Sequence, residues 1–305
     1  MKPRLIIIAG PTAVGKSDIS IELARKIDGE IISADSVQIY RGMDIGSAKI
    51  KPEEMKGVKH HLIDCLNPDE DFGVNVFQSM ASDAAKQIEA AGKIPILVGG
   101  TAFYTQALLY GIDFDGEADH DDSYRNELSI KAENEAGRIK LHEMLESIDP
   151  AYAAITHYNN SKRVIRALEY YRYTGELFSE YNKREREKEA IYDAKYFAIT
   201  DDRDVLYERI NKRVDVMIEE GLVEEVKKLR EAGYSDKLPS MQSIGYKEIN
   251  SYLNHETALD EAIALIKQNT RHLAKRQLTW LRRERDVIWI DRQTGDVQEK
   301  IYEHL

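Results

Sequence analysis

The chain has 305 residues, 42% of them hydrophobic, and a formal net charge of −11. That length is about twice a typical ~150-residue domain, which allows one large domain or a core with an insertion. A single cysteine, Cys65, excludes an internal disulfide and is typical of a reducing compartment. The N-terminal apolar run is too short for a secretory signal, and no run reaches the ~18 apolar residues of a membrane span. We therefore expect a cytoplasmic protein that does not enter membranes.

The first 112 residues alternate between short apolar runs and segments of helical period. Strands are expected at 4–9, at 29–36 (GEIISADS) and at 94–100 (IPILVGG). Helical spacing follows in 17–27, 74–93 and 101–111. Alternation of strand and helix predicts a doubly wound parallel sheet.

The pattern changes in the middle of the chain. Residues 113–195 are charged, rich in tyrosine and helical in period, without a convincing strand. Apolar runs at 194–200 (AKYFAIT) and 286–291 (DVIWID) then restore strands, with long helical segments between them. We therefore predict an α/β core formed by 1–112 and 196–305, with C-terminal helices, interrupted by a helical insertion at 113–195.

The segment GPTAVGKS, from Gly10 to Ser17, has the G-x-x-x-x-G-K-S pattern of a P-loop. It follows an apolar strand and opens a helix, which is the context that this motif requires. Glycines let backbone N–H groups turn inward around an anion, and the start of the helix adds positive potential. Lys16 would reach the phosphates, and the Ser17 hydroxyl would ligate Mg²⁺. The motif predicts phosphate binding without identifying the molecule that carries the phosphate.

Asp35 and Thr101 follow two other expected strands, at the sheet edge where α/β proteins bind ligands. Asp35 could hold a metal, cap a helix, or act as a general base toward an incoming nucleophile. Thr101 could be a helix cap without further function, or a second side chain in the same site. The residue types leave these alternatives open.

The positions of histidines and of basic residues indicate whether a zinc ion or a polyanion is an expected partner. His60 and His61 point to opposite faces of a strand and are poor joint metal ligands, so with one cysteine no structural zinc site is expected. Six Arg or Lys residues lie in 271–285 and four in 161–172, with aromatic residues between them. Solvated helix faces would explain either run alone, whereas two such runs favour a polyanionic partner despite the negative net charge.

Taken together, these segments resemble the bacterial tRNA dimethylallyltransferases of the IPP transferase family. The shared segments occur in the family order over nearly the whole chain: GPTAVGKS, ADSVQIYRGMDIGSAK, HHLID, VGGTAFYTQALLYG, RALEYYRYTG, SIGYKEI and KRQLTWLRR. The resemblance implies a P-loop, nucleotide-kinase-like core with an all-helical insertion that grips tRNA. It also implies transfer of a dimethylallyl group from dimethylallyl diphosphate to the exocyclic N6 amine of the adenosine 3′-adjacent to the tRNA anticodon, with Mg²⁺ as cofactor and diphosphate as product.

The resemblance also implies roles for individual residues. Asp35 would be the general base, and Thr101, Lys16 and Arg213 would complete the catalytic set. Prenyl diphosphate, not ATP, would lie against Arg213 and the loop Gly10, Pro11, Thr12, Ala13, Val14, Gly15, Lys16 and Ser17, with Ser17 meeting Mg²⁺ at the diphosphate. The anticodon stem-loop would contact Asp35, Ser36, Val37, Gln38, Thr101, Arg125, Lys162, Arg163, Arg166, Lys275, Arg276, Gln277, Arg282 and Arg283. We expect the chain to act as a monomer.

Three other functions fit parts of the sequence. A P-loop nucleotide kinase would use Asp35 to grip an acceptor and would turn over ATP without RNA. An adenylate isopentenyltransferase, acting on AMP, ADP or ATP, would leave the basic C-terminal run with little to do. A non-catalytic RNA-binding or GTPase-like regulatory module would leave Asp35, Thr101 and Arg213 without a role.

Overall fold

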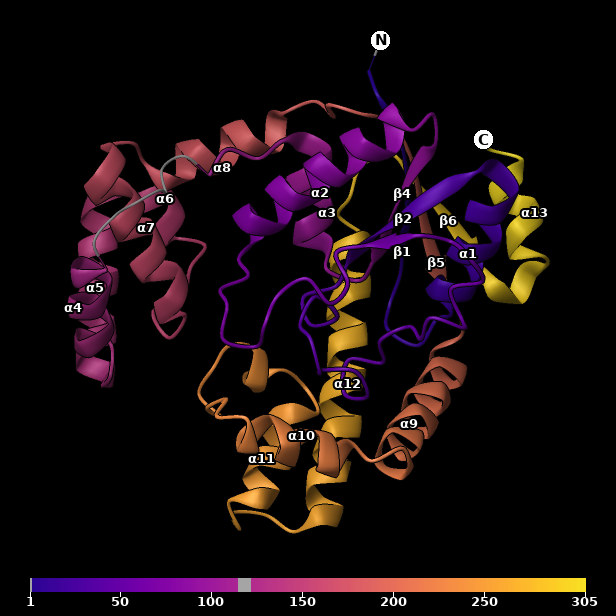
Figure 1. The fold of residues 1–305 in the computed structure, drawn as a ribbon. Coiled ribbons are helices and arrows are strands. Elements are labelled where there is room, and N and C mark those ends of the chain that lie inside the picture. Colours follow the sequence, from indigo (N-terminus) through magenta and orange to yellow (C-terminus); the bar gives the residue numbers. More distant parts are fainter. Residues whose placement is uncertain (1, 115–121) are drawn as a thin grey trace. The chain divides into compact units, whose positions relative to one another are not determined.

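The computed structural model describes residues 2–114 and 122–305. In this part of the chain six strands form one parallel sheet (Figure 1) in the order β3-β2-β4-β1-β5-β6. The strands are β1 (Arg4–Ala9), β2 (Gly29–Ala34), β3 (His60–His61), β4 (Ile94–Gly99), β5 (Asp193–Thr200) and β6 (Val287–Asp291). The residues of β2 are buried throughout, and those of β1 from Leu5 on, as expected for a parallel sheet covered on both faces.

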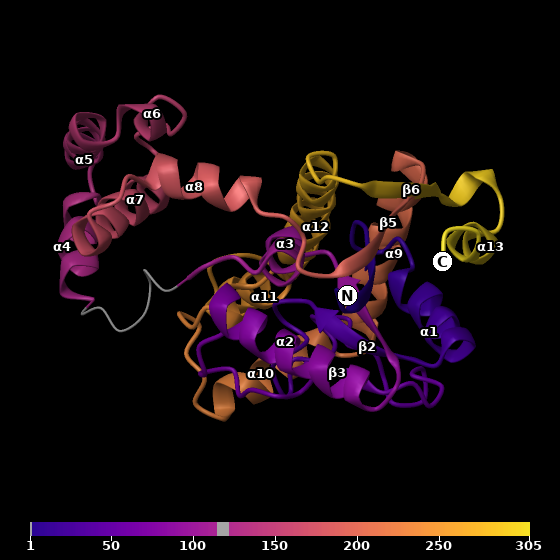
Figure 2. The same cartoon turned by 90° about the horizontal axis from the view of Figure 1, so that it is seen from above.

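Helices cover both faces of this sheet (Figures 1 and 2). α1 (Lys16–Ile27) and α13 (Val297–Tyr302) lie on one face, and α2 (Val74–Ala90) and α3 (Ala102–Tyr110) lie on the other. The four-residue spacing in α1 directs Ile19 and Leu23 into the core, where they join Ile6 and Ile8 of β1. Each such fully buried aliphatic side chain contributes roughly 1.5–3 kcal/mol of transfer free energy.

Four helices follow β5 and precede β6: α9 (Arg203–Glu219), α10 (Leu222–Glu231), α11 (Tyr246–Leu253) and α12 (Leu259–Leu281), with a short 3₁₀ turn η2 (Ser240–Gln242) before α11. Asp202 caps α9 by accepting hydrogen bonds from the N–H groups of Asp204 and Val205. α12 runs from the neighbourhood of α11 up to the sheet (Figure 1). After β6 comes a second 3₁₀ turn, η3 (Arg292–Thr294).

Residues Tyr110–Ala190 form a second compact unit with its own core. Its described part contains only helices: α4 (Ser123–Lys131), α5 (Glu135–Ile148), α6 (Pro150–Ala153), α7 (Ser161–Thr174) and α8 (Phe178–Glu187). Buried apolar residues of α4, α5, α7 and α8, among them Leu128, Leu145 and Leu168, pack together. Residues 115–121 of the insertion expected at 113–195 lie outside the described residues.

The α/β fold class is confirmed, with strands at all five expected places and a two-residue strand at His60–His61. The second strand ends at Ala34 instead of Ser36, because the Asp35 side chain accepts hydrogen bonds from the following backbone and turns the chain. Among the described residues there is no helix with the length and apolar character needed to cross a bilayer.

Candidate active site

Three strand ends meet at the carboxyl edge of the sheet. Gly99 of β4 pairs with Ala9 of β1 on one side and with Ala34 of β2 on the other. The residues that follow are therefore side by side: the P-loop after β1, Asp35 after β2, and Gly100 after β4. Gly99 itself has no room for a side chain, because a Cβ would lie 2.3 Å from the Ala34 carbonyl oxygen. Close strand packing thus brings the predicted motifs together.

A cavity of about 450 Å³ opens at this edge. The predicted site residues that line it are Thr12, Ala13, Gly15, Lys16, Ser17, Asp35, Gln38, Arg213 and Gln277. Gly10, Pro11, Val14, Ser36, Val37 and Thr101 belong to the same loops but are not part of its lining. Thr101 lies directly before α3, where its carbonyl accepts hydrogen bonds from the N–H groups of Tyr104 and Thr105.

The P-loop has the backbone conformation expected of an anion-binding loop. Ala13 and Gly15 both have positive φ angles, 64° and 87°, and α1 begins at Lys16. At Gly15 a Cβ would lie 2.3 Å from Nη1 of Arg292, so a side chain there would also displace this guanidinium. The loop therefore delivers the free N–H groups of a helix start to the cavity.

Lys16 and Arg213 form the cationic side of the cavity. The Lys16 ammonium donates hydrogen bonds to the carbonyl oxygens of Gly10 (3.0 Å) and Pro11 (2.8 Å). Burial and the nearby charge of Arg213 lower the pKa of Lys16 to about 8, against the opposing effect of Asp35. Burial likewise lowers the pKa of Arg213, while the carboxylates of Asp35 and Glu54 raise it. The cavity thus holds two partly desolvated cations, which an incoming anion would stabilise.

Asp35 already has one carboxylate oxygen engaged. Oδ1 accepts hydrogen bonds from the backbone N–H groups of Val37 (2.9 Å) and Gln38 (3.2 Å). Within residues 2–114 and 122–305, Oδ2 accepts no hydrogen bond that would block it. This geometry orients the carboxylate and leaves one oxygen without a hydrogen bond from the described residues. No helix lies between β2 and β3, so Asp35 is not the helix cap that one alternative expected; it caps a turn, and this does not preclude a catalytic role.

Gln277 of α12 contacts the P-loop. Its Oε1 accepts a hydrogen bond from the Thr12 N–H at 2.9 Å. Gly100 lies against the same amide: a Cβ there would lie 2.2 Å from Nε2 of Gln277, so a side chain at this position would require Gln277 to shift. Gln277, which the resemblance places at the tRNA, is thus bonded to the phosphate loop in this structure.

Sequence reasoning missed a group of charged residues beside the P-loop. Arg209 lines the cavity one helical turn before Arg213 and forms an ion pair of 2.5 Å with Asp201, whose side chain is fully buried. Arg292 lies 3.8 Å from the same carboxylate and donates to the Val14 carbonyl oxygen at 2.7 Å. Two signals could have revealed this group: the i, i+4 spacing of Arg209 and Arg213, and the position of Asp201 directly after β5.

The cations expected to meet RNA have different surroundings. Arg125 is bound through Nε (2.8 Å) and Nη2 (3.0 Å) by the buried carboxylate of Glu169. On α7, Lys162 and Arg163 are exposed, whereas the Arg166 guanidinium lies about 6.0 Å from the ring centre of Tyr170. Arg282 is exposed at the end of α12. A surface pocket of about 430 Å³ on α12 is lined by His272, Lys275, Arg276, Thr279, Trp280 and Arg283.

The oxygen donors in the cavity suit Mg²⁺. Among the described residues no cluster of three or more His, Cys, Asp or Glu side chains could hold a metal by itself. The cavity does contain the Ser17 hydroxyl and the carboxylates of Asp18 and Glu54. Mg²⁺ keeps several waters and is commonly bound through one or two protein oxygens together with substrate phosphates. The cavity residues can provide these protein oxygens.

Comparison with known proteins identifies the family. The family model described as IPP transferase matches residues 38–284, and a second, described as isopentenyl transferase, matches residues 3–68. The chain belongs to the IPP transferase family. It is 54% identical to the tRNA dimethylallyltransferase of Lachnoclostridium phytofermentans over 96% of this chain and 93% of that protein. It is 48% identical to the tRNA dimethylallyltransferase of Halalkalibacterium halodurans over 99% of this chain and 96% of that protein.

Solved structures of family members have the same fold. The tRNA isopentenylpyrophosphate transferase of Bacillus halodurans is similar with a TM-score of 0.74 and 46% identity, covering 99% of this chain and 94% of that one. A eukaryotic dimethylallyltransferase acting on tRNA is similar with a TM-score of 0.84 and 30% identity, covering 98% of this chain and 77% of that one. These likenesses extend over the P-loop core as well as the residues of the helical unit.

Proposed function

We propose that this protein transfers a dimethylallyl group from dimethylallyl diphosphate to the N6 amine of the adenosine 3′-adjacent to a tRNA anticodon, releasing diphosphate. The observation that carries the proposal is that one cavity contains both a cationic phosphate-binding loop and a carboxylate that can accept a proton. A P-loop with Lys16 and Arg213 can bind the diphosphate, and Asp35 beside it has one carboxylate oxygen available. The names of the full-length relatives support this choice.

In the proposed reaction, the adenine amine forms a bond to the first carbon of the prenyl group. The bond from that carbon to the diphosphate oxygen breaks, and its electron pair leaves with the diphosphate. Lys16, Arg213 and the loop N–H groups stabilise the charge that gathers there, which favours the transition state over the substrate. Asp35 accepts the amine proton, an assistance typically worth about 10²–10⁴-fold.

When bound, Mg²⁺ would neutralise part of the diphosphate charge, with Ser17 as its protein ligand beside the diphosphate oxygens. Phosphate held by such a loop could equally belong to ATP, so the loop alone does not select the substrate. In this proposal Gly10 to Ser17 bind the leaving group of an alkyl transfer.

The acceptor is proposed to be the anticodon stem-loop of a tRNA, because a base in a single-stranded loop can be unstacked and brought into a cavity. The cations at Arg125, Lys162, Arg163 and Arg166 and those of α12 would contact its phosphates. We further propose that the protein works as a monomer in the cytoplasm, where its tRNA substrate is found.

The test offers three acceptors separately: an anticodon stem-loop RNA, free AMP, and free ATP, each with dimethylallyl diphosphate and Mg²⁺. Product mass is measured, and the expected result is prenylation of the RNA alone. Transfer to AMP or ATP without transfer to RNA would show an adenylate isopentenyltransferase. Hydrolysis or phosphoryl transfer from ATP in the absence of RNA would instead show a P-loop kinase or nucleotidase.

A further inference from the structure

Glu225 of α10 binds a turn that lies far from it in sequence. Its Oε2 accepts hydrogen bonds from the backbone N–H groups of Asp44 (3.0 Å) and Ile45 (2.7 Å). Its Oε1 accepts from the N–H of Gly46 at 3.1 Å and from the Tyr246 hydroxyl at 2.7 Å. One carboxylate therefore satisfies three consecutive backbone donors, which have no partner in a regular helix or strand.

Tyr246 fixes the other side of this contact. Its side chain is fully buried, and Gly46 packs so closely that a Cβ there would lie 2.6 Å from the Tyr246 ring. Glu248 in the same helix accepts hydrogen bonds from the Gly245 N–H (2.8 Å) and from the Asn269 side chain of α12 (2.7 Å). The position of Glu225 against the turn is thus tied to the buried packing of α11 and α12.

The turn that Glu225 holds leads directly into the cavity wall. Ser47 and Ala48 line the cavity, and their carbonyl oxygens each accept a hydrogen bond of 3.4 Å from Nε2 of Gln38. The Gln38 N–H in turn donates to Oδ1 of Asp35. Hydrogen bonds and a short stretch of backbone therefore connect Glu225 to the proposed base, and none of these contacts involves the P-loop.

We infer that Glu225 is a positioning residue for the acceptor side of the cavity, the side formed by Asp35, Gln38, Ser47 and Ala48. This inference rests on the proposed function. Loss of the carboxylate leaves the N–H groups of Asp44, Ile45 and Gly46 without a fixed acceptor, so the turn relaxes. The carbonyl oxygens of Ser47 and Ala48 then no longer hold the Gln38 side chain in one position. A misplacement of about 1 Å at a reacting group can cost about 10²-fold in rate. The diphosphate side should be unaffected.

The experiment compares Glu225→Ala and Glu225→Gln with a matched control, Glu224→Gln. Glu224 is the neighbouring residue of α10, is exposed, and among the described residues forms an ion pair with Lys227 alone. Prenyl transfer to an anticodon stem-loop gives kcat and KM for each substrate. Hydrogen exchange of a peptide covering 43–48 measures the protection of the three amides at 44–46.

We expect Glu225→Ala to lower kcat/KM for RNA about 10²-fold while the KM for dimethylallyl diphosphate stays unchanged. Hydrogen exchange at 44–46 should become faster. Glu225→Gln keeps one acceptor oxygen and should lose less.

Two results would overturn the inference while leaving the proposed function intact: wild-type transfer kinetics in Glu225→Ala, or a rise in the KM for dimethylallyl diphosphate as large as the loss in kcat/KM for RNA. Failure of the wild-type protein to prenylate RNA would instead remove the proposed function. In that case the exchange measurement still decides whether Glu225 holds the turn, because it requires no substrate. Unchanged exchange in Glu225→Ala would refute the contact itself.

Discussion

Asp35 combines a structural and a proposed catalytic role in one side chain, and the two can be separated by substitution. Asparagine keeps Oδ1 and therefore the hydrogen bonds from Val37 and Gln38, but it cannot accept a proton. We predict that Asp35→Asn lowers kcat by about 10²–10⁴-fold with little change in tRNA affinity. Single-turnover prenylation and an RNA-binding titration measure the two quantities.

Asp35→Ala serves as the comparison, since it removes the turn as well as the base. It should lower kcat at least as much and also weaken RNA binding. Normal turnover in Asp35→Asn would exclude the general-base role and leave Asp35 as a residue that stabilises the turn after β2.

Lys16 gives the site a pH dependence. With a pKa of about 8 in the free protein, the side chain loses its charge as the pH rises through that value. If the proposed binding of dimethylallyl diphosphate needs the ammonium, the affinity for this substrate should fall above pH 8 by up to about tenfold per pH unit. Titrations between pH 6.5 and 9.5 test this, and Lys16→Met should bind weakly without that fall.

The same lowered pKa should make the folded protein more stable as the pH rises, whereas substrate affinity should fall. Because the folded-state pKa of Lys16 is below the model-peptide value of 10.5, the unfolded chain binds more protons between these two values. Lys16 therefore makes the free energy of unfolding increase as pH rises from about 8 toward 10.5. Relative to wild type, Lys16→Met should lose this rise.

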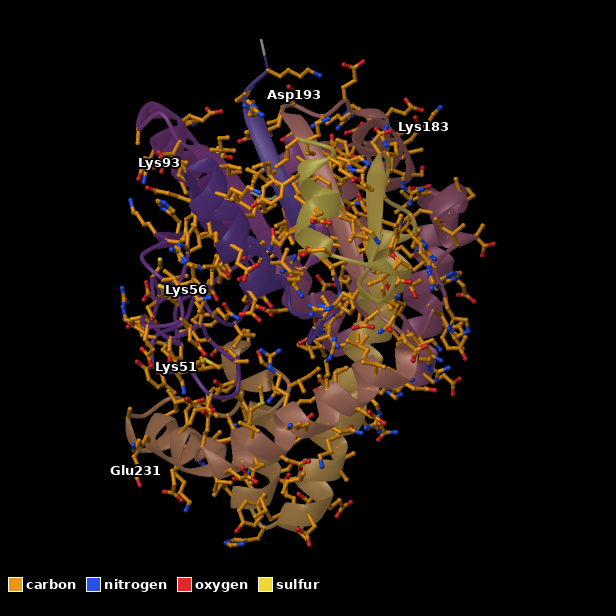
Figure 3. The ribbon with its side chains drawn as sticks, turned by 90° about the vertical axis from the view of Figure 1, so that its right-hand side faces the viewer. Lys51, Lys56, Lys93, Lys183, Asp193 and Glu231 are labelled. Atoms are coloured by element: carbon orange, nitrogen blue, oxygen red, sulfur yellow. The ribbon has the colours of Figure 1, made fainter. Side chains whose placement is uncertain are left out.

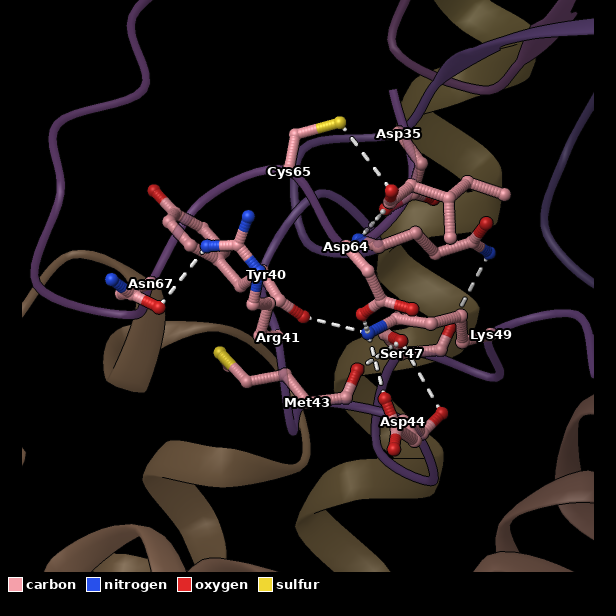
Figure 4. A network of polar contacts seen from close by, with 12 residues as sticks. Asp35, Tyr40, Arg41, Met43, Asp44, Ser47, Lys49, Asp64, Cys65 and Asn67 are labelled. Atoms are coloured by element: carbon pink, nitrogen blue, oxygen red, sulfur yellow. Dashed lines mark hydrogen bonds and ion pairs between the residues drawn. The ribbon is translucent and has the colours of Figure 1, made fainter. Parts of the chain in front are cut away.

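At the scale of an element, the loop after β2 is held by a buried lysine (Figure 4). The Lys49 ammonium donates to the Tyr40 carbonyl oxygen (2.6 Å) and pairs with Asp44 (2.7 Å) and Asp64 (2.5 Å), although its own side chain is only 5% exposed. One cation thus joins three places along the 40–64 segment. The loop has little regular secondary structure, so the Lys49 and Glu225 contacts add to the backbone hydrogen bonds that hold it.

We predict that Lys49→Met lowers the free energy of unfolding by about 1–3 kcal/mol, because it leaves the Tyr40 carbonyl without its donor. Lys51→Met is the matched control: Lys51 lies on the outer side of the same loop (Figure 3) and pairs with Glu220 at the surface. Its effect should be within about 0.5 kcal/mol. Denaturant unfolding compares the two, and equal losses would show that Lys49 has no special role.

For the whole molecule, a net charge of −11 coexists with a basic surface on α12. If Arg276 contacts an RNA phosphate, Arg276→Ala should reduce the slope of log affinity against log salt by about 0.7–0.9. The loss should be similar for different loop sequences. Lys86, exposed on α2 and paired with Asp83, provides the control substitution Lys86→Ala, which should leave the slope unchanged.

Sequence patterns were sufficient to predict the site residues that directly follow strands. Gly10 to Ser17, Asp35 and Gly100 lie at strand ends, and parallel strands place their carboxyl ends together whatever the details of packing. Arg292 was missed because its contacts with Asp201 and Val14 join residues far apart in the chain. Glu225 was missed for the same reason: its four donors come from the turn at 44–46 and from Tyr246.

The sequence by itself determined the parallel α/β core, the phosphate-binding loop and the placement of Asp35 beside it, because local periodicity and strand order suffice for these. The tertiary structure decided that Gln277 contacts the phosphate loop and that Arg125 is bound by Glu169. Those facts depend on side chains brought together across up to 265 residues of chain, a separation at which neither propensity nor spacing carries information.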